Sequence, residues 1–537
     1  MRALVLVISF IYAVNYYFCY SSLLPRTRRF VPLPGSIGLN KVNSYGNQPL
    51  VLRVQQFNAL ADGLSGLRQD LGGFSRAKQS VLNWDRRKEQ ILHEITQYDA
   101  DVITLQEIDH YYDFFLPNLS KLGYIGHYAP KPTSACLDVS GNNDGVALFI
   151  KKNRLRVISC ETTTLALSIA GVQDGELIED SKNIKLQNQV GLIAICEFVD
   201  HLTNDTASTG KSTSNPPPPV IITTTHLKSS KSSTGERYRQ KGVLQVLDEV
   251  DKIYRSLIKY NKKPVVILTG DFNAVPEKTQ YSPLAYNAVK SHRLGLRSIY
   301  NDDVPLSLVD ISSKGIYTTF KARYKSNSPN SKKDTEVIIK RCIDFIFYGP
   351  YLSINGYTSK GSLPDKALLE NILKRPPVIA FSETQLILST LLRFAVYTFG
   401  TVVPLTSLIS SSMALNDKIY VVSLALMGLA IFEIASEGTI FKPQVSVGIT
   451  SNGNSNKDSV MSESPMITAV GKVSSKIQKV TSSVTKDEGK PFAVGIRAIS
   501  ALDLFDEKEL EPDYLPSETY PSDHISIAAD LLIVWDK

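Results

Sequence analysis

Apolar, strand-like runs of this chain repeatedly lead to polar side chains that can take part in chemistry. Four runs lead in this way to Asn58, to Glu107, to His226 and to Asp271 with Asn273. Later runs carry three more residues of this kind, Asp344, Asp523 and His524. One polar residue after a strand is usually a turn residue or a helix cap. A repeated set is different, because sites gather at the carboxyl ends of strands in layered α/β folds. The pattern therefore predicts one polar site at one edge of such a fold.

The order of elements favours the same fold class. Strand-like runs are predicted at 51–57, 101–105, 145–150, 190–199, 220–226, 265–269, 343–348 and 525–534. Helical periodicity lies between several of them, at 84–97, 109–122 and 234–259. Alternating strands and helices predict a layered α/β domain. Two polar stretches are expected to interrupt it as solvated loops, 203–219 and 325–335.

Composition sets wide limits on the class of protein. Hydrophobic residues make up 43% of the 537 residues and charged residues 21%, so the chain can bury a large core. The formal net charge of +7 mildly favours anionic partners such as nucleotides, RNA or lipid head groups. The five cysteines show neither zinc-ligand spacing nor the pattern of a disulfide framework. A wholly disordered chain and a small disulfide scaffold are therefore excluded.

The chain divides into five predicted segments. Residues 1–24 contain an apolar run flanked by arginines, which is typical of a signal peptide or a signal anchor. Residues 25–48 form a linker, and the folded domain occupies 49–352 and 493–537. A long insertion, 353–492, separates the two parts of the domain. The domain can fold only if this insertion loops out with its ends close together.

The insertion contains two apolar stretches, 384–411 and 418–435. Each is near the length needed to cross a bilayer, so together they predict a transmembrane hairpin. An amphipathic segment, or non-coding sequence retained in the predicted gene, is the alternative. Residues 440–490 are rich in small polar residues and predict a disordered arm. We therefore expect membrane association through the secretory pathway or an organelle derived from it, and a cytoplasmic protein if the N-terminal run is not a signal.

The candidate residues supply carboxylates, amides and imidazoles but no cluster of thiolates. Oxygen-rich ligation suits Mg²⁺, with Mn²⁺ as the alternative, better than it suits zinc. Such a cation polarises a phosphoryl oxygen, and a histidine paired with an aspartate can stabilise developing charge or move a proton. The sequence shows no Walker lysine motif, GxSxG elbow or GxGxxG fingerprint in the context that each requires.

Three motifs together resemble the signature of the endonuclease/exonuclease/phosphatase superfamily. They are Leu105-Gln106-Glu107, Gly270-Asp271-Phe272-Asn273 and Ser522-Asp523-His524. The resemblance implies a four-layer α/β sandwich, with two packed β-sheets flanked by helices. It covers about 51–350 and 493–535.

Within the superfamily the chain is most similar to the nocturnin branch, which is related to the catalytic subunits of deadenylases. The similarity lies in Leu105 to Phe114, Pro130-Lys131-Pro132, Asn143-Asp144-Gly145 and Tyr520 to His524.

The resemblance implies a metal and water site formed by four of the residues. Glu107 would be the principal metal ligand, and Asn58 would help to hold the metal or the phosphate. Asp271 would align or deprotonate the attacking water, and Asn273 would orient the phosphoryl group. The implied cofactor is Mg²⁺.

The resemblance also implies roles for the remaining four acid and imidazole side chains. His226 would contact the scissile phosphate. His524, oriented by Asp344, would stabilise the transition state. Asp523 would lie beside the metal.

Basic residues near the motifs would meet substrate phosphates. By the resemblance these are Lys131 and Lys228. The branch usually places an arginine soon after the position of Lys228, whereas this chain has a longer loop that carries Lys231. Lysine makes no bidentate phosphate contact, which leaves the substrate preference open. Arg341 or its neighbour Lys340, shortly before Asp344, is the candidate for the other basic contact.

Several substrates remain as hypotheses. The first is the 2′-phosphate of NADP(H), and the second is poly(A) RNA cleaved by a 3′→5′ exoribonuclease. The apolar segments favour a third, a lipid phosphoesterase, and a fourth, a catalytically inactive membrane scaffold. The complete set of Glu107, Asp271 and His524 argues against an inactive protein. No obligate protein partner is indicated.

Overall fold

A computed structural model describes residues 24–33, 50–66, 73–168, 171–173, 176–178, 184–199, 216–303, 316–325, 335–351 and 494–535. Several predicted segments fall outside these ranges: the signal region up to residue 23, most of the linker, and the insertion 353–492 with its apolar stretches 384–411 and 418–435 and its arm 440–490. No helix within the described ranges is both long and apolar enough to cross a membrane. Membrane association therefore stays a prediction.

Most of the described strands belong to two mixed sheets. The first has seven strands in the order β1 (Phe30–Pro32), β16 (Val494–Leu502), β17 (Ile527–Trp535), β2 (Leu50–Asn58), β3 (Val102–Ile108), β5 (Gly145–Lys151) and β4 (Tyr124–Pro130). The pair β2 and β3 is parallel, and the other neighbours are antiparallel. The last part of the chain thus completes the sheet that the first part begins.

The second sheet has six strands. Their order is β12 (Arg297–Ser298), β15 (Asp344–Gly349), β11 (Val265–Asp271), β10 (Val220–His226), β9 (Ile184–Phe198) and β6 (Leu155–Ser168). Here β10 and β11 are the parallel pair. Two small hairpins complete the set, β13 (Thr319–Lys325) with β14 (Thr335–Arg341), and β7 (Gly171–Gln173) with β8 (Glu176–Ile178).

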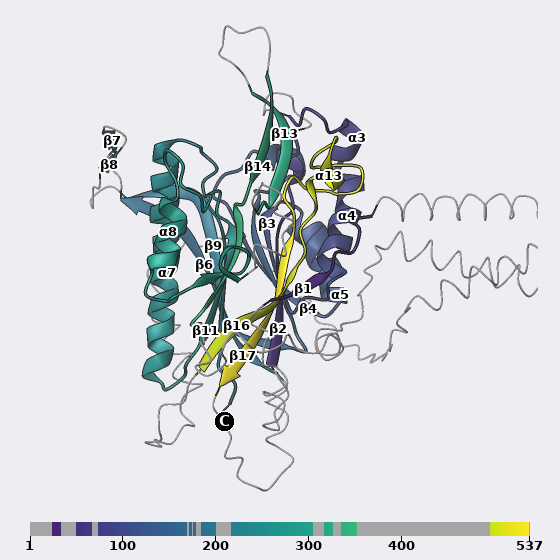
Figure 1. Ribbon diagram of the computed structural model, residues 1–537. Helices are drawn as coiled ribbons and strands as arrows, with labels where there is room; N and C mark the ends of the chain where they lie inside the picture. The colour runs from purple at the N-terminus through teal and green to yellow at the C-terminus, as the bar shows by residue number, and fades with distance from the viewer. Residues whose placement is uncertain are drawn as a thin grey trace, which may run out of the picture. The chain divides into compact units, whose positions relative to one another are not determined.

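Helices cover the outer face of each sheet (Figure 1). On the first sheet lie α3 (Gln79–Leu82), α4 (Trp84–Thr96), the π-helix η4 (Tyr111–Phe115) and α5 (Leu116–Lys121). On the second lie α7 (Ser233–Lys259) and α8 (Leu284–Ser291). Shorter helical turns connect these elements: η2 (Asp62–Leu64), α6 (Leu137–Ser140), η6 (Ile299–Asp303) and α13 (Glu507–Leu510).

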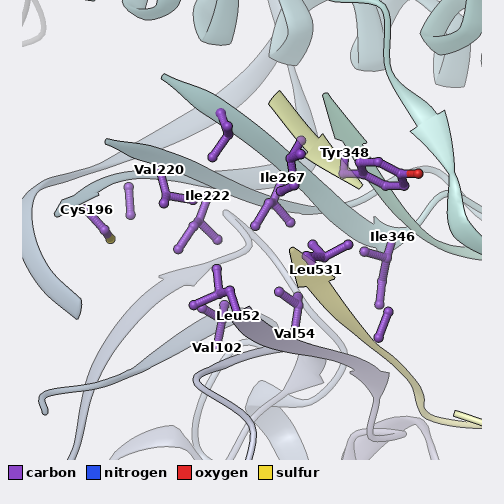
Figure 2. Packing of buried hydrophobic residues seen from close by; sticks show 14 of the residues in the cluster. Leu52, Val54, Val102, Cys196, Val220, Ile222, Ile267, Ile346, Tyr348 and Leu531 are labelled. Carbon is purple, nitrogen blue, oxygen red and sulfur yellow. The ribbon is translucent and has the colours of Figure 1, made fainter. Parts of the chain in front are cut away.

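Alternation of apolar residues along the strands produces the layers. In β11, Val265 and Ile267 face the first sheet, whereas Val266 and Leu268 face α7 and α8. A strand that is buried on both faces reads as a continuous apolar run, which is how this strand appears in the sequence. Figure 2 shows the contact between the sheets, where Leu52 and Val54 of the first sheet lie opposite strands of the second. The predicted four-layer sandwich is confirmed.

Strands that the sequence pattern does not predict are mostly strands at sheet edges or in hairpins. Both β4 and β6 end a sheet, and β13 and β14 pair only with each other. These strands lack the continuous apolar runs of the strands that are buried on both faces. A different case is β1, which falls inside the segment predicted as a linker and pairs with β16. Three residues are too few to show a period, and the pairing partner lies almost 500 positions away in the sequence.

Gly270 fixes the close approach of the two parallel strands of the second sheet. Its φ is +146°, and a Cβ placed on it would lie 2.1 Å from the carbonyl oxygen of Thr225. Both the backbone conformation and the space exclude a side chain. Gly270→Ala is expected to destabilise the domain by about 3 kcal/mol or more, measured as the free energy of unfolding in urea. Gly123→Ala is the matched control, because Gly123 also has a positive φ but a Cβ placed on it would have no atom within 4 Å.

Candidate active site

The two parallel strand pairs bring the predicted residues together at one end of the sandwich. Asn58 is the last residue of β2 and pairs with Gln106, which directly precedes Glu107. His226 ends β10 and pairs with Asp271, which ends β11. Asp271 in turn pairs with Asp344, the first residue of β15. Because the sheets pack face to face, the strand ends of both contribute to one cluster of side chains.

The backbone at this cluster is unusual. Glu107 has a φ of +56° and lies at an irregularity in the pairing of β3 with β5. Side chains other than glycine rarely adopt this conformation, and a bulge turns a side chain away from the direction that regular pairing would give it. Such strained positions cluster at functional sites. The bulge is therefore the local reason why the Glu107 carboxylate lies in the site.

Asn58 and Asp271 are each held by a local turn of the same type. Each side-chain oxygen accepts a hydrogen bond from the backbone N–H two residues later, from Leu60 at 3.1 Å and from Asn273 at 2.8 Å. Both of these later residues have a positive φ, +59° at Leu60 and +50° at Asn273. Asx turns of this kind lock the side chain before any ligand arrives. This orients the polar groups without requiring other side chains.

Asn58 links the two central carboxylates. Its amide nitrogen donates to Glu107 Oε1 and to Asp271 Oδ2, each at 3.0 Å. The oxygen of the same amide accepts from Leu60. In this arrangement Asn58 holds the two carboxylates in place, and the contact with a metal or a phosphate that the resemblance implies stays a prediction.

Glu107 and Asp271 form a cluster with His226 that is suited to a cation. His226 Nε2 lies 3.9 Å from Glu107 Oε1 and 3.5 Å from Asp271 Oδ2, and one ligand atom from each residue lies within 4.8 Å of the others. Burial, and then the charge of Asp523, raises the pKa of Glu107. Burial, and then Asp344, raises the pKa of Asp271 to about 7. The carboxylates of Glu107 and Asp271 thus concentrate negative charge that nearby positive side chains do not fully balance. A divalent cation fits both this charge and the oxygen and nitrogen ligands.

His524 and Asp344 form a buried pair beside this cluster. Asp344 Oδ2 lies 2.8 Å from His524 Nδ1, and His524 Nε2 lies 3.8 Å from Asp271 Oδ2. Burial lowers the pKa of His524, but Asp344, Asp523 and Asp271 outweigh it and raise that pKa to about 9. His524 is therefore a cation at neutral pH, and its other nitrogen points to the site.

His226 is in the opposite state. Burial, followed by the positive charges of Lys131 and His524, holds the pKa of His226 well below its usual value. Its Nε2 lies 3.2 Å from the amide nitrogen of Asn273, which also donates to the Leu227 carbonyl at 3.0 Å. The site therefore pairs a charged histidine with a neutral one.

Asp523 lies at the border of the site. Its carboxylate is bound by Lys321 of β13 and lies 3.6 Å from a guanidinium nitrogen of Arg323. Among the described residues, two groups have metal-ligand geometry, Glu107 with His226 and Asp271, and Asp271 with Asp344 and His524, and Asp523 belongs to neither. Asp523 nevertheless raises the pKa of Glu107 and of His524, so it acts on the site through its charge.

The four predicted basic residues differ in how close they lie to the cluster. Lys131 Nζ is 2.5 Å from Asp144, and its charge acts on both Glu107 and His226. Lys228 follows the strand of His226, with its ammonium group 5.4 Å from the ring centroid of Tyr238. Lys231 lies in the loop before α7. Arg341 ends β14, and burial and the neighbouring Arg239 lower its pKa. The structure thus ties Lys131 to the carboxylates more directly than the other three.

Several side chains of the site have no motif in the sequence. Thr318 Oγ1 donates to Asp344 Oδ2 at 2.7 Å, and Gln56 Nε2 donates to Asp344 Oδ1 at 3.1 Å. Lys321 and Arg323 are linked to the site by their ion pairs with Asp523. Gln56 does not stand out in the sequence, because its strand also carries the polar residues Arg53 and Gln55. The two basic residues lie in β13, where basic and apolar residues alternate as in any half-exposed strand, so nothing in the pattern singles them out as site residues.

Comparison with known proteins identifies the family. The profile of the Endonuclease/Exonuclease/phosphatase family matches residues 56–182, which include Asn58 and Glu107. These residues carry a domain of this family. Mouse nocturnin is 34% identical over 276 residues, which cover 51% of this chain and 52% of the mouse protein. The CCR4-Not complex 3′-5′-exoribonuclease subunit Ccr4 of Mycosarcoma maydis is 28% identical over 232 residues, 39% of this chain and 32% of that protein.

A solved structure of the human nocturnin catalytic domain with bound sulfate aligns with a TM-score of 0.44 and 21% identity, over 95% of this chain and 99% of that one. This chain spans about half the length of the first curated relatives that it matches.

Proposed function

We propose that this family member is a hydrolase that uses a divalent cation to cleave phosphoester bonds. The observation that supports this proposal most is that carboxylates able to bind a cation lie next to a positively charged histidine. The carboxylates of Glu107 and Asp271 can hold a cation, and the cationic His524 lies 3.8 Å from Asp271. An electron-poor phosphorus with negatively charged oxygens is the substrate that such a site fits.

The geometry assigns separate tasks to the side chains. When bound by Glu107 and Asp271, the cation supplies polarisation of a phosphoryl oxygen. Asp271 is placed to orient the attacking water and to take its proton, because its Oδ2 lies 3.5 Å from His226 Nε2 and 3.8 Å from His524 Nε2, at the centre of the cluster. His524 offsets the charge that grows on the phosphoryl oxygens, and Asp344 keeps it protonated and oriented. The neutral His226 and Asn273 line the same side of the site.

The 2′-phosphate of NADP(H) is our first choice of substrate. It is supported by the similarity to nocturnins over half of the chain and by the resemblance in the segment of Lys131. Lys131 keeps its charge, since Asp144 and Glu107 outweigh the effect of burial and raise its pKa. A 3′→5′ exoribonuclease acting on poly(A) is the second candidate, supported by the similarity to the Ccr4 exoribonuclease subunit.

Release of inorganic phosphate by the purified protein distinguishes the two candidates. NADP⁺ and NADPH are incubated with Mg²⁺, with Mn²⁺ or with EDTA, and NAD⁺ serves as the substrate that lacks the 2′-phosphate. A labelled poly(A) oligonucleotide is followed on a gel in parallel. Phosphate release from NADP⁺ but not from NAD⁺, with intact RNA, is the expected result. RNA shortening without phosphate release would move the protein to the exoribonucleases, and no reaction in either assay would contradict the proposal.

Lys131 is expected to contribute to substrate binding more than to the chemical step. Lys131→Met should raise KM by about tenfold with a smaller change in kcat, because a charged hydrogen bond to a phosphate contributes about 1.5–3 kcal/mol. Lys151→Met is the matched control, since Lys151 belongs to the neighbouring strand β5 and is likewise paired with an aspartate, Asp99. Steady-state kinetics on both variants test this, and equal KM values for the two would contradict it.

A further inference from the structure

Residues 26–33 are part of the folded domain although the sequence pattern assigns them to a linker. Besides the β1 pairing, Leu33 N donates to Ile499 O at 2.9 Å and Asp503 N donates to Arg29 O at 2.8 Å. Thr27 Oγ1 donates to the side chain of Gln97 at 2.8 Å. We call residues 26–33 the N-terminal strap. It joins α4 to the chain segment around β16.

Arg28 is the most deeply buried polar residue of the N-terminal strap, with 4% of its surface exposed. Its Nη2 donates to Glu94 Oε1 at 2.6 Å and to the carbonyl and hydroxyl oxygens of Ser526 at 2.9 and 2.7 Å. Its Nη1 donates to the Asp503 carbonyl at 3.0 Å. The guanidinium group also lies over the ring of Phe505, 4.9 Å from the centroid. A side chain with this many buried contacts does not belong to a flexible connection.

Glu94 of α4 carries the effect of Arg28 to both sides of His524. The same Oε1 that accepts from Arg28 also accepts from the hydroxyl groups of Tyr520 at 3.1 Å and Ser526 at 2.6 Å. Tyr520 OH in turn accepts from the backbone N–H of Ser526 at 2.9 Å. Tyr520 precedes His524 by four residues and Ser526 follows it by two. One carboxylate oxygen therefore closes the loop 520–526 at its two ends.

The charge of Glu94 makes this arrangement depend on Arg28. Glu94 is fully buried, and within the described ranges Arg28 is the cation with which it forms an ion pair. Removing one partner of a buried pair leaves an uncompensated charge, and the surroundings must rearrange or admit water to accommodate it. Besides Arg28, the side-chain groups that contact that charge are the Tyr520 and Ser526 hydroxyls and the amide nitrogen of Gln97. A rearrangement would therefore move the loop that carries His524.

We propose that the N-terminal strap belongs to the catalytic domain and that Arg28 is a positioning residue, which acts through Glu94 and Tyr520 on the loop 520–526. The effect on turnover rests on the proposed function, whereas the effect on the loop does not. His524 must be held within a fraction of an ångström of its productive position, and misplacement by about 1 Å can lower a rate by about 100-fold. The strap sets that position from the opposite end of the sequence.

Four variants of the full chain test this. Arg28→Met removes the counter-charge, and Tyr520→Phe removes only the hydroxyl that joins Glu94 to the loop. Arg26→Met is the control, because Arg26 lies on the same strap but its pair with Glu509 is largely exposed. We expect kcat to fall by at least about tenfold in the first two variants with KM nearly unchanged, and no change in the control. Arg28→Lys, which keeps the charge, should recover part of kcat.

Hydrogen exchange provides a readout that does not depend on activity. The backbone amides of Ile525 and Ser526 should exchange at least about tenfold faster in Arg28→Met and Tyr520→Phe than in the control. If the two variants exchange faster but the wild type shows no turnover, the structural role of the strap is supported and only the proposed function is rejected. Wild-type kcat and wild-type exchange in Tyr520→Phe would overturn the proposal about Arg28, and this holds even if Arg28→Met does not fold.

Discussion

Glu107→Gln is expected to lower kcat/KM for phosphoester hydrolysis by about 10³-fold, equivalent to about 4 kcal/mol of transition-state stabilisation. Glu107 is one of the two carboxylates that can hold the cation, and an amide replaces a full negative charge with a dipole. The amide can still accept from Asn58, so the geometry of Asn58 and Asp271 should persist. The measurement is phosphate release with Mg²⁺ or Mn²⁺ over a range of metal concentrations.

The same substitution should stabilise the metal-free domain. Burial and Asp523 raise the pKa of Glu107, which means that its ionised form is less favourable in the folded state than in the unfolded state. For such an acid the destabilisation is present above the unfolded pKa and disappears as the pH falls below it. At neutral pH, Glu107→Gln should therefore raise the Tm in EDTA. Added Mn²⁺ should raise the Tm of the wild type and leave that of the variant nearly unchanged.

Glu197→Gln is the matched control for both measurements. Glu197 is partly buried and forms ion pairs with Lys262 and Arg156, away from the site. Its variant should keep wild-type kinetics and the wild-type response of Tm to the cation. A Glu107→Gln protein that retained activity would mean that the site is assigned to the wrong residues. Lower stability in EDTA would show instead that Glu107 serves the fold.

The sequence predicts the strands that carry the site because these strands are buried on both faces. The run 265–268 is continuously apolar, and the carboxylate of Asp271 at the end of the strand marks its place in the site. The parallel pairs then bring Asn58 next to Glu107 and His226 next to Asp271. Residues that act at strand ends can in this way be predicted from a single sequence.

Residues that act through another side chain are not readable in this way. Thr318 and Gln56 matter because both contact Asp344, and that contact depends on how two sheets pack. Arg28 is harder to predict, because a segment with three basic residues, Arg26, Arg28 and Arg29, has the composition of a solvated linker. Only the pairing of β1 with β16, across almost the whole chain, buries it against Glu94. Long-range pairing of three residues leaves no local pattern.

Asp344→Asn should lower kcat by about 10³-fold with little change in KM, because it acts on His524 and not on substrate binding. Asp344 accepts hydrogen bonds from Gln56, Thr318 and His524, so its carboxylate oxygens have only donors around them. An amide nitrogen in either position would face another donor. His524 would lose both its orientation and the charge that keeps it protonated.

The pH profile separates these effects. Asp344 is the largest of the groups that raise the pKa of His524, to about 9 in the wild type. Wild-type kcat should therefore persist up to about pH 9 and fall above it, as His524 loses its proton. In Asp344→Asn the pKa of His524 falls, so the alkaline loss of activity should move to lower pH. An unchanged alkaline limb would mean that another group, and not His524, is the required acid.

A double-mutant cycle decides whether the pair acts as one unit. His524→Ala alone should cost about as much as Asp344→Asn, and His524→Ala/Asp344→Asn should cost little more than either, because Asp344 has no task once the imidazole is gone. Ser298→Ala, which changes a buried serine on the strand next to β15, is the control for a general effect on packing. Fully additive losses would show that Asp344 acts on the reaction independently of His524, for example through its pairing with Asp271 at the end of β11.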